Sequence, residues 1–201
     1  SPPAGGPLVA AKSMLPKSGD LKGPGRWRPI AVLRVLYKLF SRMLFARLQP
    51  ILNTAQSNDQ FGFRPRRSIE DVFVVLESLC AESDEYDVPL WMASLDLKKA
   101  FDQIEFKSLF AALEEQHVPK CYIHLFAALY SNQTGAVRRS RAFPIRRGVK
   151  QGDVISPILF NAGLEKAFRR WKARLGTHGV LLQANGERMT NTRYADDIML
   201  Y

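Results

Sequence analysis

Two adjacent acidic residues, Asp196 and Asp197, lie in a stretch of sequence where charge is unexpected. They follow Tyr194 and precede the apolar run 198–201, whose residue types are typical of a β-strand, in which Asp is disfavoured. Two carboxylates side by side on a tight turn repel each other and need a cation nearby. A hard divalent ion such as Mg²⁺, which prefers oxygen ligands, meets that need. Taken alone, the pair also fits a solvated turn.

A third carboxylate, Asp96, ends the short apolar run 90–95, which we predict to be a buried strand. An Asp at this place is often a helix N-cap, and residues 97–102 lead into a predicted helix. However, two strands that both present carboxylates at their ends can converge on one site. Two-metal phosphoryl transfer needs such an arrangement, with ions about 3.5–4 Å apart that hold the attacking and leaving oxygens.

The elements that position these acids are predicted from apolar spacing and turn residues. Strands interleaved with helices indicate an α/β or α+β domain, and the lack of a regular βαβ repeat argues against a Rossmann fold. We expect Ser68 to cap a helix, with Asp71 completing a capping box. Further helices are expected at 30–48 (ending near Pro50), 105–117, 120–131 and 156–175, and hairpins at 134–147 and around Asn185-Gly186.

The composition favours a polyanionic partner. The 201 residues include 29 Lys and Arg against 19 Asp and Glu, a net charge of +10, and such an excess points most often to nucleic acid. Cys80 and Cys121 have no CxxC partner, which excludes a zinc ribbon and a disulfide framework. We therefore expect a reducing, intracellular compartment, with nucleus and cytoplasm undetermined. No apolar run approaches the roughly 18 residues that span a bilayer.

Several blocks of the sequence resemble the motifs of reverse transcriptases and follow that family's order. Residues 96–102 (DLKKAFD) and 194–197 (YADD) resemble its two carboxylate motifs. Blocks near 15–38 and 60–68 (QFGFR, then RS) resemble its fingers motifs, and 148–161 (GVKQGD, then SP and LFN) resembles the segment that supports the incoming nucleotide. Together they extend from about residue 14 to 201, and QGDxxSP with LFN is similar to non-LTR (LINE-type) retrotransposon enzymes in particular.

The resemblance implies a right-hand polymerase fold whose palm is an antiparallel sheet backed by helices. It places the fingers at 1–88 and 105–155 and the palm at 89–104 and 156–201, with no thumb in these residues. It implies an RNA-directed DNA polymerase that adds deoxynucleotides to a primer 3′-hydroxyl by two-metal phosphoryl transfer. The implied cofactors are two Mg²⁺ ions, with Mn²⁺ as an alternative. The implied partners are an RNA template, a DNA primer and dNTPs, without a membrane, and we expect a longer natural protein.

The resemblance also assigns roles to single residues. Asp96 and Asp196 are expected to be the principal metal ligands, with Asp197 as the second acid of the turn. Five residues are expected to bind the nucleotide. Lys17 and Arg28 are expected to contact the triphosphate, and the ring of Phe101 to exclude a 2′-hydroxyl. Gln151 and Gly152 are expected to lie near the nascent base pair. Phosphates of the nucleic acid are expected to contact Arg64, Arg138, Arg139, Arg146 and Arg147.

Two alternatives remain open at this point. A group II intron-type or telomerase-like reverse transcriptase would share the chemistry. A catalytically inactive, polymerase-derived RNA-binding module would keep the fold; the intact acids argue against it, and the lack of a thumb argues for it. Arg66 stands where related elements often carry Gly, so it either disturbs a turn or adds a phosphate contact.

Overall fold

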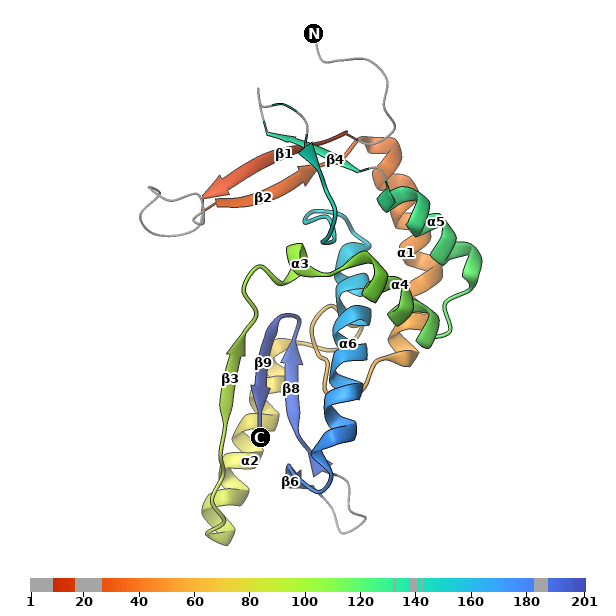
Figure 1. Ribbon diagram of the computed structural model, residues 1–201. Coiled ribbons are helices and arrows are strands. Elements are labelled where there is room, and N and C mark those ends of the chain that lie inside the picture. Colours follow the sequence, from red (N-terminus) through yellow and green to blue (C-terminus); the bar gives the residue numbers. More distant parts are fainter. Residues whose placement is uncertain (1–8, 17–26, 132, 138–140, 142, 183–187) are drawn as a thin grey trace.

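The computed structural model describes residues 9–16, 27–131, 133–137, 141, 143–182 and 188–201. Figure 1 shows two sheets near opposite ends of an elongated molecule, with a layer of helices between them. The upper sheet has the strand order β2-β1-β4-β5. Strand β1 is antiparallel to β2 and parallel to β4. The strands are β1 (Val9–Pro16), β2 (Trp27–Val32), β4 (Thr134–Val137) and β5 (Phe143–Pro144).

The lower sheet has the order β3-β9-β8, and both pairings are antiparallel. Its strands are β3 (Ala93–Asp96), β8 (Asn191–Tyr194) and β9 (Asp197–Leu200). Helix α2 (Ile69–Tyr86) runs beside this sheet in Figure 1 and contacts β8. A small hairpin of β6 (Val180–Leu181) and β7 (Arg188–Met189) precedes β8.

The hydrophobic core lies among the helices between the sheets. These helices are α1 (Val35–Ala55), the short α3 (Ala100–Gln103), α4 (Phe106–Glu115), α5 (Lys120–Ser131) and α6 (Ser156–Leu175). Helix α4 packs against both α5 and α6. Each fully buried Leu or Phe side chain stabilises the fold by about 1.5–3 kcal/mol. The Leu and Phe side chains of the core that are at most 2% exposed are Leu48, Leu52, Leu109, Leu113, Phe126, Leu159 and Phe160.

Most of the predicted helices and turns are confirmed. Helices α4, α5 and α6 cover the expected ranges, and α6 begins at Ser156 with Pro157 in its first turn. The capping box of α2 is present, because the Ser68 backbone N–H donates to Asp71 at 2.7 Å. Strands β4 and β5 form the expected basic hairpin, whereas Asn185-Gly186 lie outside the described residues.

Three expectations about the elements are wrong. The predicted helix does not start at Ile30, because Trp27–Val32 pair with β1 as a strand. Helix α1 continues past Pro50 to Ala55, since the apolar face that buries Leu48 also buries Leu52 on the other side of the proline. Strand β3 is exposed along its whole length rather than buried, because it is the edge strand and α2 contacts β8 instead.

The division into fingers and palm stays a prediction. It assigns α2 to the fingers, although this helix contacts the lower sheet, which carries the acids. Among the described residues, no helix is long and apolar enough to cross a bilayer.

Candidate active site

The three candidate acids lie at one end of the lower sheet. Tyr194 pairs with Asp197, so Ala195 and Asp196 form a two-residue turn between β8 and β9. Ala195 has φ 59°, in the left-handed region that such hairpin turns require. On the other side of β9, Asp96 pairs with Asp197. The fold therefore brings together the two carboxylate motifs that the sequence analysis singled out.

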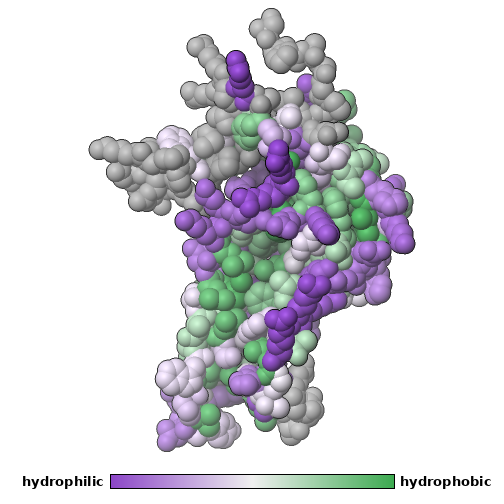
Figure 2. Space-filling model, in the orientation of Figure 1, coloured by the Kyte–Doolittle hydropathy of each residue, from purple (hydrophilic) through white to green (hydrophobic). Residues whose placement is uncertain are grey.

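The electrostatics of this end are unfavourable in the absence of a cation. Partial burial raises the pKa of Asp197 above its usual range, and the negative charges of Asp196 and Asp96 raise this pKa further. Among the described residues, none donates a hydrogen bond or forms an ion pair with any of the three carboxylates. Figure 2 shows apolar side chains over the lower sheet and a hydrophilic band above it.

The donor set of this site fits a hard divalent ion. In the described part of the chain, no three His, Cys, Asp or Glu side chains stand close enough to form a finished metal site. However, Asp96, Asp196 and Asp197 offer only oxygen ligands, share one sheet end and have no side-chain partner among the residues that the structure describes. Such a set suits Mg²⁺ or Mn²⁺ rather than zinc, which prefers nitrogen and sulfur.

Phe101 is anchored close to the acids by two other rings. It follows β3 in helix α3, and its ring stacks on Phe160 at a centroid distance of 4.4 Å and an interplanar angle of 7°. The exposed Phe63 meets the same ring edge-on at 6.3 Å. Phe101 is only partly buried, so part of its ring is accessible. Its expected role in excluding a 2′-hydroxyl stays a prediction.

The segment with Gln151 and Gly152 joins the upper sheet to the helix that follows β3. The Gln151 carbonyl accepts a hydrogen bond from the backbone N–H of Ala31 in β2 at 2.8 Å. Its side-chain amide donates to Asp102 of α3 at 3.2 Å. Gly152 has φ 97°, and a Cβ there would lie 3.0 Å from the Ile30 side chain. Only glycine fits this approach without strain.

A buried polar cluster beneath this segment was not predicted. Lys150 donates to the hydroxyl of Tyr37 at 3.2 Å, and its ammonium lies 4.4 Å from the centre of the same ring. Burial lowers the pKa of Lys150, and the negative charge of Asp153 partly offsets this shift. Asp153 is itself buried and accepts a hydrogen bond from Ser41 of α1. The cluster connects α1 to the segment that is predicted to bind the nucleotide. The sequence feature that could have predicted it is the pair of opposite charges, Lys150 and Asp153, within the short stretch GVKQGD.

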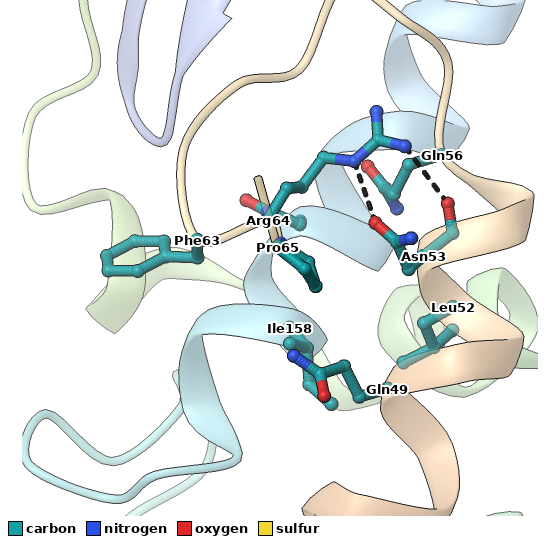
Figure 3. Close-up of a pocket in the computed structure, with 9 residues that line it drawn as sticks. Gln49, Leu52, Asn53, Gln56, Phe63, Arg64, Pro65 and Ile158 are labelled. Atoms are coloured by element: carbon teal, nitrogen blue, oxygen red, sulfur yellow. Dashed lines mark hydrogen bonds between the residues drawn. The ribbon is translucent and has the colours of Figure 1, made fainter. Parts of the chain in front are cut away.

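The side chain of Arg64 makes several hydrogen bonds within the protein, and its predicted contact with nucleic acid stays a prediction. Its guanidinium donates to the side chain and the carbonyl of Asn53 at 2.9 and 3.1 Å, and to the carbonyls of Ser57 and Gln60 at 2.6 and 3.2 Å. These bonds satisfy carbonyl groups at and beyond the end of α1, which helix termini leave unpaired. Figure 3 shows Arg64 turned toward Asn53 rather than away from the molecule. Arg64 is therefore engaged within the protein.

A buried ion pair behind the carboxylate turn was also missed. Arg193 of β8 and Glu165 of α6 are both fully buried, and they meet at 2.9 Å. The guanidinium also lies over the ring of Phe168 at 4.4 Å and donates to Ser57. Burial acts in the opposite direction, but the charge and hydrogen bonds of Arg193, with help from Arg169, hold the pKa of Glu165 below its usual range.

Three of the remaining predicted residues, Arg28, Arg146 and Arg147, lie in or next to the upper sheet. Arg146 and Arg147 are exposed after β5, and Arg147 forms an isolated bridge with Glu105. The backbone of Arg28 belongs to β2, and its side chain is not among the described features. Three further residues of the prediction fall outside the described residues, namely Lys17, Arg138 and Arg139.

Residues 15–201 match the family model described as reverse transcriptase (RNA-dependent DNA polymerase). The chain belongs to the reverse transcriptase family. The expected resemblance to non-LTR enzymes is confirmed by its relatives. It is 28% identical over 193 residues to the retrovirus-related Pol polyprotein from type-1 retrotransposable element R2 of Popillia japonica, and 29% identical over 195 residues to the transposon TX1 uncharacterized 149 kDa protein of Xenopus laevis. These matches cover 94% and 95% of this chain, but only 26% and 15% of the relatives.

The fold of this reverse transcriptase domain is also that of a solved telomerase structure. The telomerase of Candida tropicalis, in complex with a TWJ fragment of telomeric RNA, superposes with a TM-score of 0.63 and 15% identity. The match covers 95% of this chain and 35% of the telomerase chain. At that identity the likeness establishes the fold alone. It confirms the predicted α/β polymerase fold with an antiparallel sheet and helices beside it.

Proposed function

We propose that the protein is an RNA-directed DNA polymerase that extends a DNA primer on an RNA template, and that it derives from a retrotransposon. The observation that carries this proposal is the register of the lower sheet, which opposes Asp96 to Asp197 beside the turn residue Asp196. Membership of the reverse transcriptase family supports the same activity. The chain spans about a quarter or less of the relatives named above, so substrates and partners of the whole protein belong to this proposal.

Asp96 and Asp196 are proposed to hold two divalent ions, and Asp197 to complete the set. When bound, such ions lower the pKa of the primer 3′-hydroxyl and neutralise charge on the triphosphate. Phe101 then limits the space beside the sugar, and Gln151 with Gly152 lies against the new base pair. Lys17 and Arg28 contribute positive charge toward the triphosphate, because phosphoryl transfer needs cations on the developing negative charge.

Nucleic acid binding is proposed to depend on the basic segment around β4 and β5. Arg146 and Arg147 are exposed there and suit contacts to phosphates, with Arg138 and Arg139 nearby in the sequence. Such contacts give affinity without base specificity and weaken as the salt concentration rises. We further propose a reducing, intracellular compartment, since Cys80 and Cys121 are both exposed and free.

Primer extension tests the proposed activity. The full-length natural protein is incubated with an RNA template, a DNA primer, dNTPs and Mg²⁺, and compared with its Asp196→Asn variant. We expect extension by the wild type and a loss of at least about 100-fold in the variant, because electrostatic groups of this kind contribute roughly that much. No extension by the wild type in Mg²⁺ or Mn²⁺, with salt-sensitive RNA binding equal in both proteins, would instead identify an inactive RNA-binding module.

A further inference from the structure

The segment 59–61 lies along the outer edge of β8 and restrains the strand that leads into the carboxylate turn. The backbone N–H of Phe61 donates to the carbonyl of Arg193 at 2.7 Å. In return, the N–H of Arg193 donates to the carbonyl of Asp59 at 2.7 Å, and Gln60 and Arg193 form a parallel bridge. A piece of the second fingers motif therefore acts as an additional short strand beside the acids.

The side chain of Gln60 reaches from this segment to the turn itself. It is fully buried, and its amide oxygen accepts the backbone N–H of Ala195 at 3.1 Å and that of Gly62 at 2.9 Å. Both partners are backbone N–H donors, so the oxygen of the Gln60 amide, and not its nitrogen, must face the turn. Ala195 is buried and has φ 59°, so without Gln60 its N–H would be a buried donor at a strained position.

At Gly62, the backbone that continues from segment 59–61 lies so close to the carboxylate turn that there is no room for a side chain. A Cβ on Gly62 would lie 2.3 Å from the Ala195 nitrogen, a distance at which something must move. On the opposite side, the Asn161 amide of α6 donates to the Gly62 carbonyl at 2.8 Å. Gln60 therefore lies in a segment that is fixed by α6 on one side and touches the turn on the other.

We propose that Gln60 is a positioning residue for the catalytic carboxylates. Its amide oxygen fixes the N–H of Ala195, and the two-residue turn transmits this constraint to Asp196 and Asp197. Gln60 is too deeply buried to touch substrate, so it acts through the turn alone. The proposal rests on the proposed polymerase function for its kinetic consequences, but its effect on ion binding by the three acids is independent of catalysis.

Gln60→Met is the informative substitution, because it keeps the length of the side chain and removes the acceptor. The amide nitrogen of Gln60 has no hydrogen-bond partner among the described residues, so the change also removes an unsatisfied donor. Gln116→Met is the matched control. Gln116 is equally buried and loses two bonds, one from Gln56 and one to the Ala162 carbonyl at 2.8 Å, away from the turn. Gln60→Glu retains an acceptor oxygen and serves as the conservative variant.

The full-length protein and these variants are compared in Mn²⁺ affinity, followed by electron paramagnetic resonance, and in primer extension with kcat, dNTP KM and template–primer Kd measured separately. We expect Gln60→Met to weaken Mn²⁺ binding and to lower kcat about 10–100-fold, as loss of a group that supports metal ligands typically does. The template–primer Kd should stay within about twofold, Gln116→Met should change neither Mn²⁺ affinity nor kcat, and Gln60→Glu should recover part of the loss.

The two proposals fail in different ways. Wild type that binds Mn²⁺ without extending a primer would refute the polymerase function, while a Mn²⁺ deficit confined to Gln60→Met would still support positioning. Equal Mn²⁺ affinity and kcat in Gln60→Met, Gln116→Met and wild type would overturn the positioning role. If Gln60→Met does not fold, Gln60→Leu, which also lacks the acceptor, decides: weaker Mn²⁺ binding than in Gln116→Met supports the role, and wild-type Mn²⁺ binding and kcat refute it.

Discussion

Asp96 and Asp197 occupy opposed positions on neighbouring strands, in the last residue pair of the β3–β9 ladder. Like charges placed directly opposite each other destabilise a sheet, by roughly 0.2–1 kcal/mol for pairs of this kind. Burial and the two neighbouring acids raise the pKa of Asp197, and the contribution of the acids to this shift reflects the same repulsion between carboxylates. The two acids lower stability at the position where the protein would need oxygen ligands for a divalent ion. Such local destabilisation is typical of a binding site rather than of a sheet end with a purely structural role.

Removing the charge of Asp197 should therefore stabilise the protein while inactivating it. In buffer without divalent ions, we expect Asp197→Asn to raise the Tm by up to about 3 °C at pH 7. The folded state holds the Asp197 proton more tightly than the unfolded chain, so this carboxyl lowers stability as the pH rises through its folded pKa. The gain should therefore shrink at pH values below the usual carboxylate range. Differential scanning calorimetry across pH measures it.

A control substitution that should change the Tm in the opposite direction is available at Asp59. Asp59 forms an ion pair with Lys172, so Asp59→Asn should lower the Tm. Addition of Mg²⁺ should raise the Tm of the wild type more than that of Asp197→Asn, because a ligand that binds the folded state stabilises it. A lower Tm for Asp197→Asn in metal-free buffer at pH 7 would contradict the repulsion.

Arg64 should contribute to stability rather than to nucleic acid binding. Arg64→Met removes four hydrogen bonds to partly buried oxygen atoms at and beyond the end of α1, so we expect a loss of about 2–3 kcal/mol of unfolding free energy. The slope of log K for RNA binding against log salt should not change. Chemical denaturation and filter binding at several salt concentrations measure the two quantities.

The matched variant for this comparison is Arg146→Met, which replaces an exposed arginine with no recorded partner in the described part of the chain. It should leave the unfolding free energy within about 0.5 kcal/mol. If Arg146 contacts one phosphate of a single strand, the salt slope should fall by about 0.7. A reduced slope in Arg64→Met with unchanged stability would restore the original prediction for Arg64.

The buried pair of Arg193 and Glu165 should be strongly coupled. Removal of one partner leaves the other charge buried with weaker compensation, from Arg169 for Glu165 or from Asp59 at 3.9 Å for Arg193. Arg193→Met or Glu165→Gln should therefore each lower stability by up to about 3–5 kcal/mol, and the double variant by much less than the sum. The pKa of Glu165 is held down, so its contribution is present above the usual carboxylate range and is lost as the pH falls through its folded pKa. A double-mutant cycle in urea, at pH 7 and at acidic pH, tests both statements; additive losses would contradict the coupling.

Two glycines should respond to alanine with opposite signs. Gly148 has φ 88°, and a Cβ there would lie 2.8 Å from the Asp102 Cα, so Gly148→Ala should lower stability by more than about 2 kcal/mol. Gly163 lies inside α6, where a Cβ would meet only the Ile104 side chain at 3.5 Å or more. Gly163→Ala should therefore raise stability by up to about 1 kcal/mol, because alanine favours a helix. Urea denaturation of both variants tests this contrast, and equal effects would contradict it.

The three acids could be singled out as candidates from the sequence because their unusual feature is local. Asp96 and Asp197 both lie next to apolar, strand-forming residues, where Asp is unusual. The fold then pairs the two strands that carry them. The capping box at Ser68 and the proline that opens α6 were predicted for the same reason, since each depends on residues within one helical turn.

Features that depend on distant partners were missed. Whether residues near Ile30 form a helix or a strand depends on β1, because their apolar spacing fits both structures. The burial of β3 could not be inferred, since its short apolar run is also compatible with an edge strand. The role of Gln60 depends on Ala195, and that of Arg64 on the end of α1, so neither could be recognised from neighbours in sequence.

The edge position of β3 also has a consequence for synthesis on the ribosome. In the described residues, its only strand partner is β9, which comes much later in the sequence, so Asp96 leaves the ribosome long before the strand that aligns it. During that interval the backbone of β3 has no strand to pair with, and the apolar side chains of Trp91, Met92 and Leu95, which are exposed even in the folded structure, lie beside it and can contact other chains. Translation rate and chaperone supply should then govern how much polypeptide reaches the polymerase fold, and slower elongation should favour aggregation before the centre can assemble.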